Sequence, residues 1–196
     1  MTLARSTLAN RVRAALEAAE AGSRASLRGS LARGTADDYS DIDVEWLVPA
    51  AAFPGCVDVV PVLSAVRPVA AVRFSPDFLH SPVQRLVFVR FEGVSVFWRL
   101  DLDIRTDAAD DRPGPAAEGE WSRPASALAN ALGAVKAVAR GRFEDARGLL
   151  DRGFTRIGSA DRATGDWAAD VGRLAAACAR LEPGLAGFAA EVAASA

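Results

Sequence analysis

The sequence contains few of the residues on which several common protein chemistries depend. Its 196 residues include two cysteines, one histidine and one lysine. Cys56 and Cys178 lie far apart and lack the spacing of a metal site, and their apolar neighbours predict reduced core residues of a cytoplasmic protein. The single histidine, His80, lies in a predicted loop, so histidine-based catalysis has little support.

Long apolar runs and an excess of basic charge are also absent from the sequence. No run approaches the ~20 apolar residues that a membrane span needs, and the N-terminal residues lack the apolar core of a signal peptide, so we expect no membrane partner. The formal net charge of -2 argues against nucleic acid as a partner. A composition of 51% hydrophobic and 24% charged residues is typical of a globular protein.

The hydrophobic pattern predicts an α+β fold in two parts. Residues 4–21 have the spacing of an amphipathic helix, and later segments such as "AAVRFS" and "QRLVFVRFEG" have the character of strands. Glu92 and Gly93 are predicted to form a hairpin turn that leads directly into a strand, "VSVFWRLDLDIRT". A segment rich in proline, glycine and acid then predicts a linker. We therefore expect one domain over residues 1–110 and a small helical bundle over residues 121–196.

Acidic residues interrupt two apolar strands at alternate positions. In "DIDVEWLVP" the apolar residues face one way, and Asp41, Asp43 and Glu45 face the other. Carboxylates are poor strand formers, and side chains two residues apart, ~6.6 Å along a strand, can converge on one cation or on two closely spaced cations. Asp101 and Asp103 repeat the pattern in "RLDLDIRT". The alternative is a solvated strand face that blocks aggregation.

A Gly-Ser pair precedes the first acidic strand. Gly29 would let the backbone approach a phosphate closely, and Ser30 would stand at a helix N-terminus, where free N–H groups favour an anion. Mg²⁺ is usually held by a few carboxylates together with substrate phosphates, and sites with two such ions carry out phosphoryl transfer. The two motifs together predict a Mg²⁺ site that handles phosphate. A Gly-Ser pair alone is also typical of an ordinary turn and helix cap.

The stretch "GSLARGTADDYSDIDVEWLV" resembles the signature of the DNA polymerase β-like nucleotidyltransferases, most strongly over residues 27–48. Within that superfamily it is most similar to the small bacterial aminoglycoside- and lincosamide-type nucleotidyltransferases. The resemblance implies a mixed β-sheet with flanking helices, a triphosphate bound by Gly29 and Ser30, and two Mg²⁺ ions held by Asp41, Asp43 and a third acid. It also implies transfer of a nucleoside monophosphate to a hydroxyl group, with pyrophosphate as the leaving group.

The resemblance does not assign the third metal ligand or the general base to one residue, and a few acids are candidates for each role. Asp101, between Leu100 and Leu102, fits the family's hydrophobic-Asp-hydrophobic pattern, and we prefer it to Asp103 as the third ligand. The acid of this pair that is not a ligand would act as the general base, and Glu45 is the other candidate for that role.

These features predict a Mg²⁺-dependent nucleotidyltransferase. It would transfer a nucleoside monophosphate from a nucleoside triphosphate, with ATP as the default, to a hydroxyl acceptor such as an aminoglycoside-like antibiotic. Lys136 is predicted to bind the nucleotide as a point charge, and the alternative is a surface lysine with no role. A second hypothesis is an antitoxin-like or regulatory nucleotidyltransferase that acts on or binds a protein partner. A third is a structural protein whose acids only keep it soluble.

Overall fold

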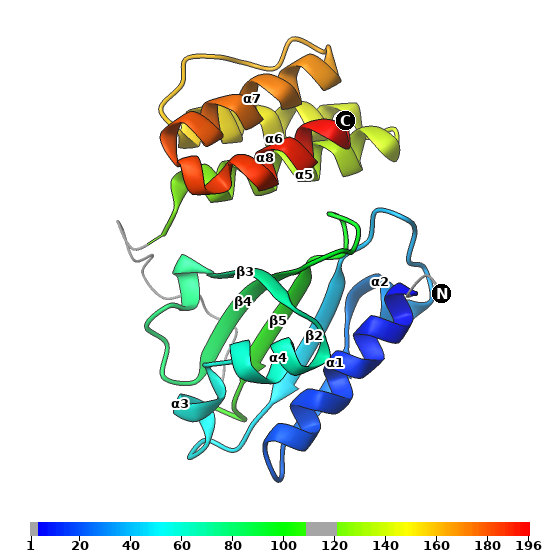
Figure 1. The fold of residues 1–196 in the computed structure, drawn as a ribbon, viewed down its shortest axis with the longest axis vertical. Helices are drawn as coiled ribbons and strands as arrows, with labels where there is room; N and C mark the ends of the chain where they lie inside the picture. The colour runs from blue at the N-terminus through cyan, green and yellow to red at the C-terminus, as the bar shows by residue number, and fades with distance from the viewer. Residues whose placement is uncertain (1–3, 109–120) are drawn as a thin grey trace. The chain divides into compact units, whose positions relative to one another are not determined.

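The computed structural model describes residues 4–108 and 121–196, and the chain forms two compact units divided between Trp121 and Ser122 (Figure 1). The described residues form five strands and eight α-helices, so the predicted α+β class is confirmed. The predicted linker includes residues 109–120, which lie outside the described part of the chain. Within the described ranges, no helix combines the length and the apolar character that crossing a membrane requires.

The first unit is built on a mixed five-stranded sheet. Its strands are β1 (Arg24–Leu27), β2 (Ile42–Leu47), β3 (Val69–Phe74), β4 (Gln84–Phe91) and β5 (Leu100–Arg105). They lie in the order β1-β2-β5-β4-β3 (Figure 1). β2 and β5 pair in parallel, whereas the other three pairs are antiparallel. Two strands that are far apart in the sequence are therefore neighbours in the middle of the sheet.

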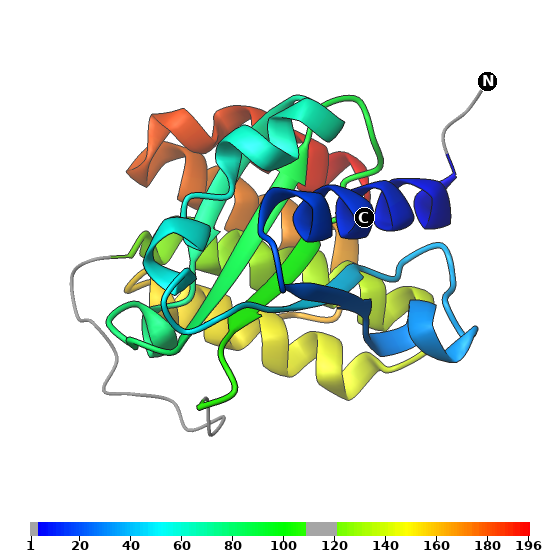
Figure 2. The same ribbon diagram turned by 90° about the horizontal axis from the view of Figure 1, so that it is seen from below.

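Alternating burial decides which face of the sheet the helices cover. The helices of this unit are α1 (Arg5–Ala19), α2 (Gly29–Arg33), α3 (Phe53–Cys56) and α4 (Val60–Val66). Even-numbered residues of β2 and β5 are buried and apolar, and α1 and α4 cover this face (Figure 2). Trp46 is 2% exposed in the core, and its indole N–H donates to Ser23 Oγ at 2.9 Å. The odd-numbered acids lie on the opposite face, so the predicted alternation is confirmed.

The connection between β4 and β5 differs from the predicted hairpin. The sequence predicts a turn at Glu92–Gly93 followed at once by a strand, but β5 begins only at Leu100. Residues 92–99 instead form a loop, in which the Ser95 carbonyl accepts a hydrogen bond from the Trp98 amide at 2.9 Å. This turn draws the backbone away from ladder pairing. The predicted strand before Leu100 is therefore wrong.

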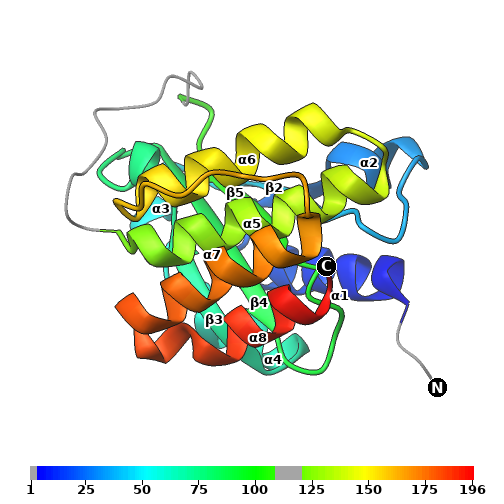
Figure 3. The ribbon, with the colours of Figure 1, turned by 90° about the horizontal axis from the view of Figure 1, so that it is seen from above.

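The second unit contains four α-helices (Figure 3). They are α5 (Arg123–Ala139), α6 (Phe143–Arg156), α7 (Trp167–Leu181) and α8 (Ala186–Ala194), and α5 packs against the other three. Ser122 caps α5 by accepting a hydrogen bond from the Ala125 amide at 2.9 Å. Lys136 is 8% exposed within α5, so its alternative interpretation as a surface lysine is wrong.

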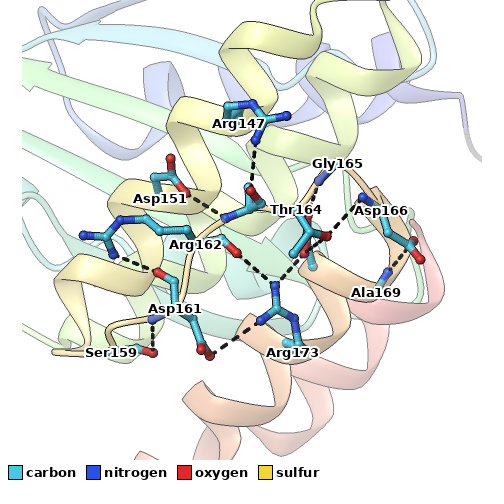
Figure 4. A network of polar contacts seen from close by, with 12 residues as sticks. Arg147, Asp151, Ser159, Asp161, Arg162, Thr164, Gly165, Asp166, Ala169 and Arg173 are labelled. Carbon is cyan, nitrogen blue, oxygen red and sulfur yellow. Dashed lines mark hydrogen bonds and ion pairs between the residues drawn. The ribbon is translucent and has the colours of Figure 1, made fainter.

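A network of polar contacts holds the connection between α6 and α7 (Figure 4). Asp170 is 0% exposed and accepts hydrogen bonds from the Thr164 amide at 2.7 Å, the Thr164 hydroxyl at 2.9 Å and the Gly165 amide at 3.1 Å. Arg173 donates to the same carboxylate at 2.6 Å. Burial alone would raise the pKa of Asp170, but the hydrogen bonds from Arg173, Gly165 and Thr164 lower it overall.

Asp170→Asn is expected to destabilise the second unit by about 1–3 kcal/mol, because the neutral side chain no longer accepts the charge-assisted hydrogen bonds from Thr164, Gly165 and Arg173. Since the pKa of Asp170 is lowered by folding, its contribution is present above the unfolded pKa and is lost as the pH falls through the folded pKa. Urea unfolding at neutral pH and below about pH 3 measures both effects. The exposed ion-pair variant Asp145→Asn, a control, should cost less than about 1 kcal/mol. If the difference in unfolding free energy between wild type and Asp170→Asn is as large in acid as at neutral pH, this interpretation is wrong.

Cys56 and Cys178 are free and buried, as the sequence predicts. Burial raises the pKa of both thiols, to about 11 for Cys178, and the charge of Glu182 adds to the effect there. We expect neither thiol to react with an alkylating reagent at neutral pH before the protein unfolds. Mass spectrometry should count no label on the native chain and two after denaturation; rapid labelling of native Cys178 would be incompatible with this packing.

Candidate active site

The acids of two strands meet across the parallel pair β2 and β5. In this register Asp43 lies opposite Asp101, and Glu45 lies opposite Asp103. Asp41 comes directly before β2, at the next alternate position from Asp43. All five side chains are half-buried. The fold thus brings together, on one face of the sheet, the acids of the two motifs.

An arginine that sequence reasoning missed lies among these carboxylates. Arg99 forms a bidentate ion pair with Asp101, with Nε 2.5 Å from Oδ1 and Nη2 2.7 Å from Oδ2. Burial alone would lower the pKa of Arg99, but its pairing with Asp101 and the charges of Asp41 and Asp43 raise it. The available signal was its position two residues before Asp101, on the same face of the chain. Arg99 supplies positive charge to three neighbouring carboxylates that would otherwise repel one another.

The carboxylates suit Mg²⁺ by their chemistry but do not form a ready metal site. Carboxylate oxygens are ligands that Mg²⁺ prefers, and the register makes Asp43 and Asp101 neighbours. Across residues 4–108 and 121–196, however, no group of three or more His, Cys, Asp or Glu side chains is placed to hold a metal ion. The Arg99 guanidinium instead contacts both oxygens of Asp101. Binding of Mg²⁺ would require Arg99 to release that carboxylate.

Gly29 joins the Gly-Ser pair to the acidic strand. It begins α2 with a φ of +56°, and a Cβ placed on it would lie 2.0 Å from Asp43 Oδ2. Only glycine allows this contact without displacing the carboxylate. The Arg28 amide also donates to the Asp43 carbonyl at 2.8 Å, which fixes the start of α2 against β2. The Ser30 hydroxyl makes no hydrogen bond within the described residues and remains available to a ligand.

Glu45 and Asp103 belong to a separate set of ion pairs. Glu45 pairs with Arg28 and, at 3.8 Å, with Arg105. Asp103 lies 3.7 Å from the same Arg105 nitrogen and accepts a hydrogen bond from Gln84 Nε2 at 3.0 Å. These two acids therefore already have partners supplied by the fold. Asp101, the acid of β5 that lies opposite Asp43, also has a partner, Arg99, so the choice between Asp101 and Asp103 as the third metal ligand stays a prediction.

The predicted nucleotide-binding residues lie in different units of the chain. Gly29 and Ser30 belong to the first unit, and Lys136 lies on α5 of the second. The contact of Lys136 with a nucleotide stays a prediction.

Comparisons with known proteins identify no family. No family model matches the chain, and no curated protein matches it either. The function must therefore be argued from the residues of this chain and their arrangement.

Proposed function

We propose that this protein is a Mg²⁺-dependent nucleotidyltransferase that transfers a nucleoside monophosphate from a nucleoside triphosphate to a hydroxyl group. One observation supports the proposal most: Gly29 of the Gly-Ser pair packs against Asp43, and Asp43 lies opposite Asp101. The backbone at Gly29, which suits a phosphate, therefore lies beside carboxylates that suit Mg²⁺. Phosphoryl transfer needs both within one site.

In this proposal Asp41, Asp43 and Asp101 hold two Mg²⁺ ions, and Gly29 and Ser30 bind the triphosphate. When bound, Mg²⁺ neutralises phosphate oxygens and stabilises the charge that develops during transfer. Gly29 lets the backbone approach the phosphates because it carries no side chain. The Ser30 hydroxyl donates a hydrogen bond to a phosphate oxygen.

Asp103 is the candidate general base. The acceptor oxygen forms a bond to the α-phosphorus, the bond from this phosphorus to the bridging oxygen breaks, and pyrophosphate leaves with the electron pair. The acceptor proton passes to a carboxylate within hydrogen-bond reach. Asp103 lies one alternate position along β5 from Asp101 and points to the same face. Its partners, Gln84 and Arg105, include one cation, whereas Glu45 pairs with two, Arg28 and Arg105.

We propose that the acceptor is a small hydroxylated molecule, such as an aminoglycoside-like antibiotic, and that ATP is the donor. Five half-buried acids share one face around β2 and β5, beside Arg28, Arg99 and Arg105. Such a face attracts a cationic sugar.

Matched variants of the two acids of β5 test these assignments. Asp101→Asn is expected to lose both Mg²⁺-dependent nucleotide binding and turnover. Asp103→Asn should keep nucleotide binding but lose turnover by about 10²–10⁴-fold, the usual contribution of a general base. Isothermal titration calorimetry measures binding, and pyrophosphate release with a panel of hydroxylated antibiotics measures turnover. The assignments are wrong if Asp101→Asn binds nucleotide as wild type does or if Asp103→Asn turns over normally.

A further inference from the structure

A cavity of about 370 Å³ opens in the first unit, beside the candidate active site. It lies among the start of α1, the end of α2 and the loop before β5. Leu31 and Ala36 give it an apolar wall, and Arg5, Asp38 and Trp98 give it a cation, an anion and an aromatic surface. Its size and mixed lining are typical of a small-molecule site.

The fold leaves most polar groups of this cavity unused. Within residues 4–108 and 121–196, the Asp38 carboxylate and the Trp98 indole N–H have no hydrogen-bond or ion-pair partner. Arg5 makes one contact, from Nη1 to the Ser40 carbonyl at 3.1 Å, and its Nε is buried without a partner. Arg5 and Asp38 do not pair with each other. The buried, unpartnered Nε of Arg5 and the opposite charge of the exposed Asp38 at one cavity indicate a ligand with complementary edges.

The loops around the cavity are held in place without a ligand. The Asp37 carboxylate accepts hydrogen bonds from the Ser40 hydroxyl at 2.8 Å and from the Tyr39 amide at 3.1 Å. Tyr39 packs edge-to-face on Phe97, with ring centroids 5.1 Å apart, and so joins the loop that carries Asp38 to the loop before β5. A preformed cavity reduces the ordering cost of binding.

Three chain segments link the lining of the cavity to residues of the candidate active site. Leu31 directly follows Ser30, and Trp98 directly precedes Arg99. The Ser40 carbonyl that holds Arg5 directly precedes Asp41. When the phosphates of a ligand lie at the Gly-Ser pair, the rest of that ligand is therefore within reach of this cavity.

We infer that the cavity binds the nucleobase of the nucleoside triphosphate and selects bases with an amino group, an inference that rests on the proposed function. The base stacks on Trp98, as bases do on aromatic side chains. Its amino group donates to Asp38, and a ring nitrogen or carbonyl oxygen accepts from Arg5. A neutral base with a donor edge and an acceptor edge fits one anion and one cation better than a cationic sugar does. Uracil lacks the amino group.

Binding of ATP, CTP, UTP and inorganic tripolyphosphate, each with Mg²⁺, tests this inference by isothermal titration calorimetry. Wild type is expected to bind ATP and CTP at least about 10-fold more tightly than UTP, since a hydrogen bond to a charged group contributes about that factor. Asp38→Ala should remove this preference, and Trp98→Leu should weaken the binding of all three nucleotides. Neither variant should change tripolyphosphate binding. Asp58→Ala, at an exposed acid outside the cavity, is the matched control and should bind like wild type.

The outcomes separate the cavity from the proposed function. If wild type binds neither nucleotides nor tripolyphosphate, the proposed function and the base site both fail. If wild type binds tripolyphosphate and all nucleotides, but shows no preference among bases and no effect of Asp38→Ala or Trp98→Leu, the base site is overturned and the proposed function stands.

Discussion

Asp43→Asn is expected to lower nucleotidyl transfer by about 10³-fold or more. Asp43 contacts Gly29 and lies opposite Asp101, so it stands at the centre of the proposed site. Removal of its charge would cost several kcal/mol of metal-assisted charge stabilisation, and each 1.36 kcal/mol corresponds to about a factor of ten. Pyrophosphate release under saturating Mg²⁺ and nucleotide measures the loss.

The fold of this variant should survive, because the Asp43 side chain is half-buried rather than in the core. Far-UV circular dichroism and urea unfolding provide that check. Asp58→Asn, an exposed acid in the same unit, serves as the control for a lost surface charge. Turnover by folded Asp43→Asn within a few-fold of wild type would remove the basis for a metal-dependent site.

Gly29→Ala is expected to lower both stability and activity. A Cβ at this position would lie 2.0 Å from Asp43 Oδ2, and the φ of +56° disfavours any side chain. The backbone strain and the displaced carboxylate should cost about 2–4 kcal/mol of stability. Because a shift of about 1 Å in a reacting group can cost 10²-fold in rate, turnover should fall by about that factor or more.

Gly22→Ala is the matched control for this substitution. Gly22 lies outside the cavity and has a φ of +80°, and a Cβ on it would meet only Pro49 Cγ, at an ordinary contact distance of 3.7 Å. It should lose about 1–2 kcal/mol of stability from backbone strain and keep its turnover. The difference between the two variants, measured by urea unfolding and pyrophosphate release, isolates the contact of Gly29 with Asp43. Equal losses of activity in both would show that this contact has no catalytic consequence.

The side-chain pattern was sufficient to predict which face of the sheet carries the acids. A strand turns alternate residues to opposite faces, so the buried positions of Val44 and Trp46 determine that Asp43 and Glu45 lie on the other side. The same local rule predicts the face of Asp101 and Asp103. This part of the site depends only on backbone geometry within each strand.

The opposition of Asp43 and Asp101 could not be predicted in the same way. The register of two parallel strands that are far apart in the sequence depends on tertiary packing, and alternation within a strand does not specify it. A shift of two residues would have placed Asp43 opposite Asp103 with the same faces buried. The resemblance to nucleotidyltransferases favours Asp101, and the register places this acid, rather than Asp103, opposite Asp43.

Long side chains and loops account for what sequence reasoning missed. Arg99 lies in a segment that the sequence predicts as strand and the structure places in a loop. Its long side chain pairs with Asp101, and the charges of Asp41 and Asp43 also raise its pKa. The cavity beside the site depends on the contact of Tyr39 with Phe97 from a second loop. Such contacts between loops have no periodic pattern in the sequence.

A crystal structure with Mn²⁺ and a non-hydrolysable ATP analogue tests the central claim most directly. We predict anomalous scattering from Mn²⁺ at the carboxylates of Asp43 and Asp101, phosphates of the analogue at Gly29 and Ser30, and Arg99 turned away from Asp101. An intact pair between Arg99 and Asp101, with no Mn²⁺ at these carboxylates under saturating metal and nucleotide, would contradict the proposal.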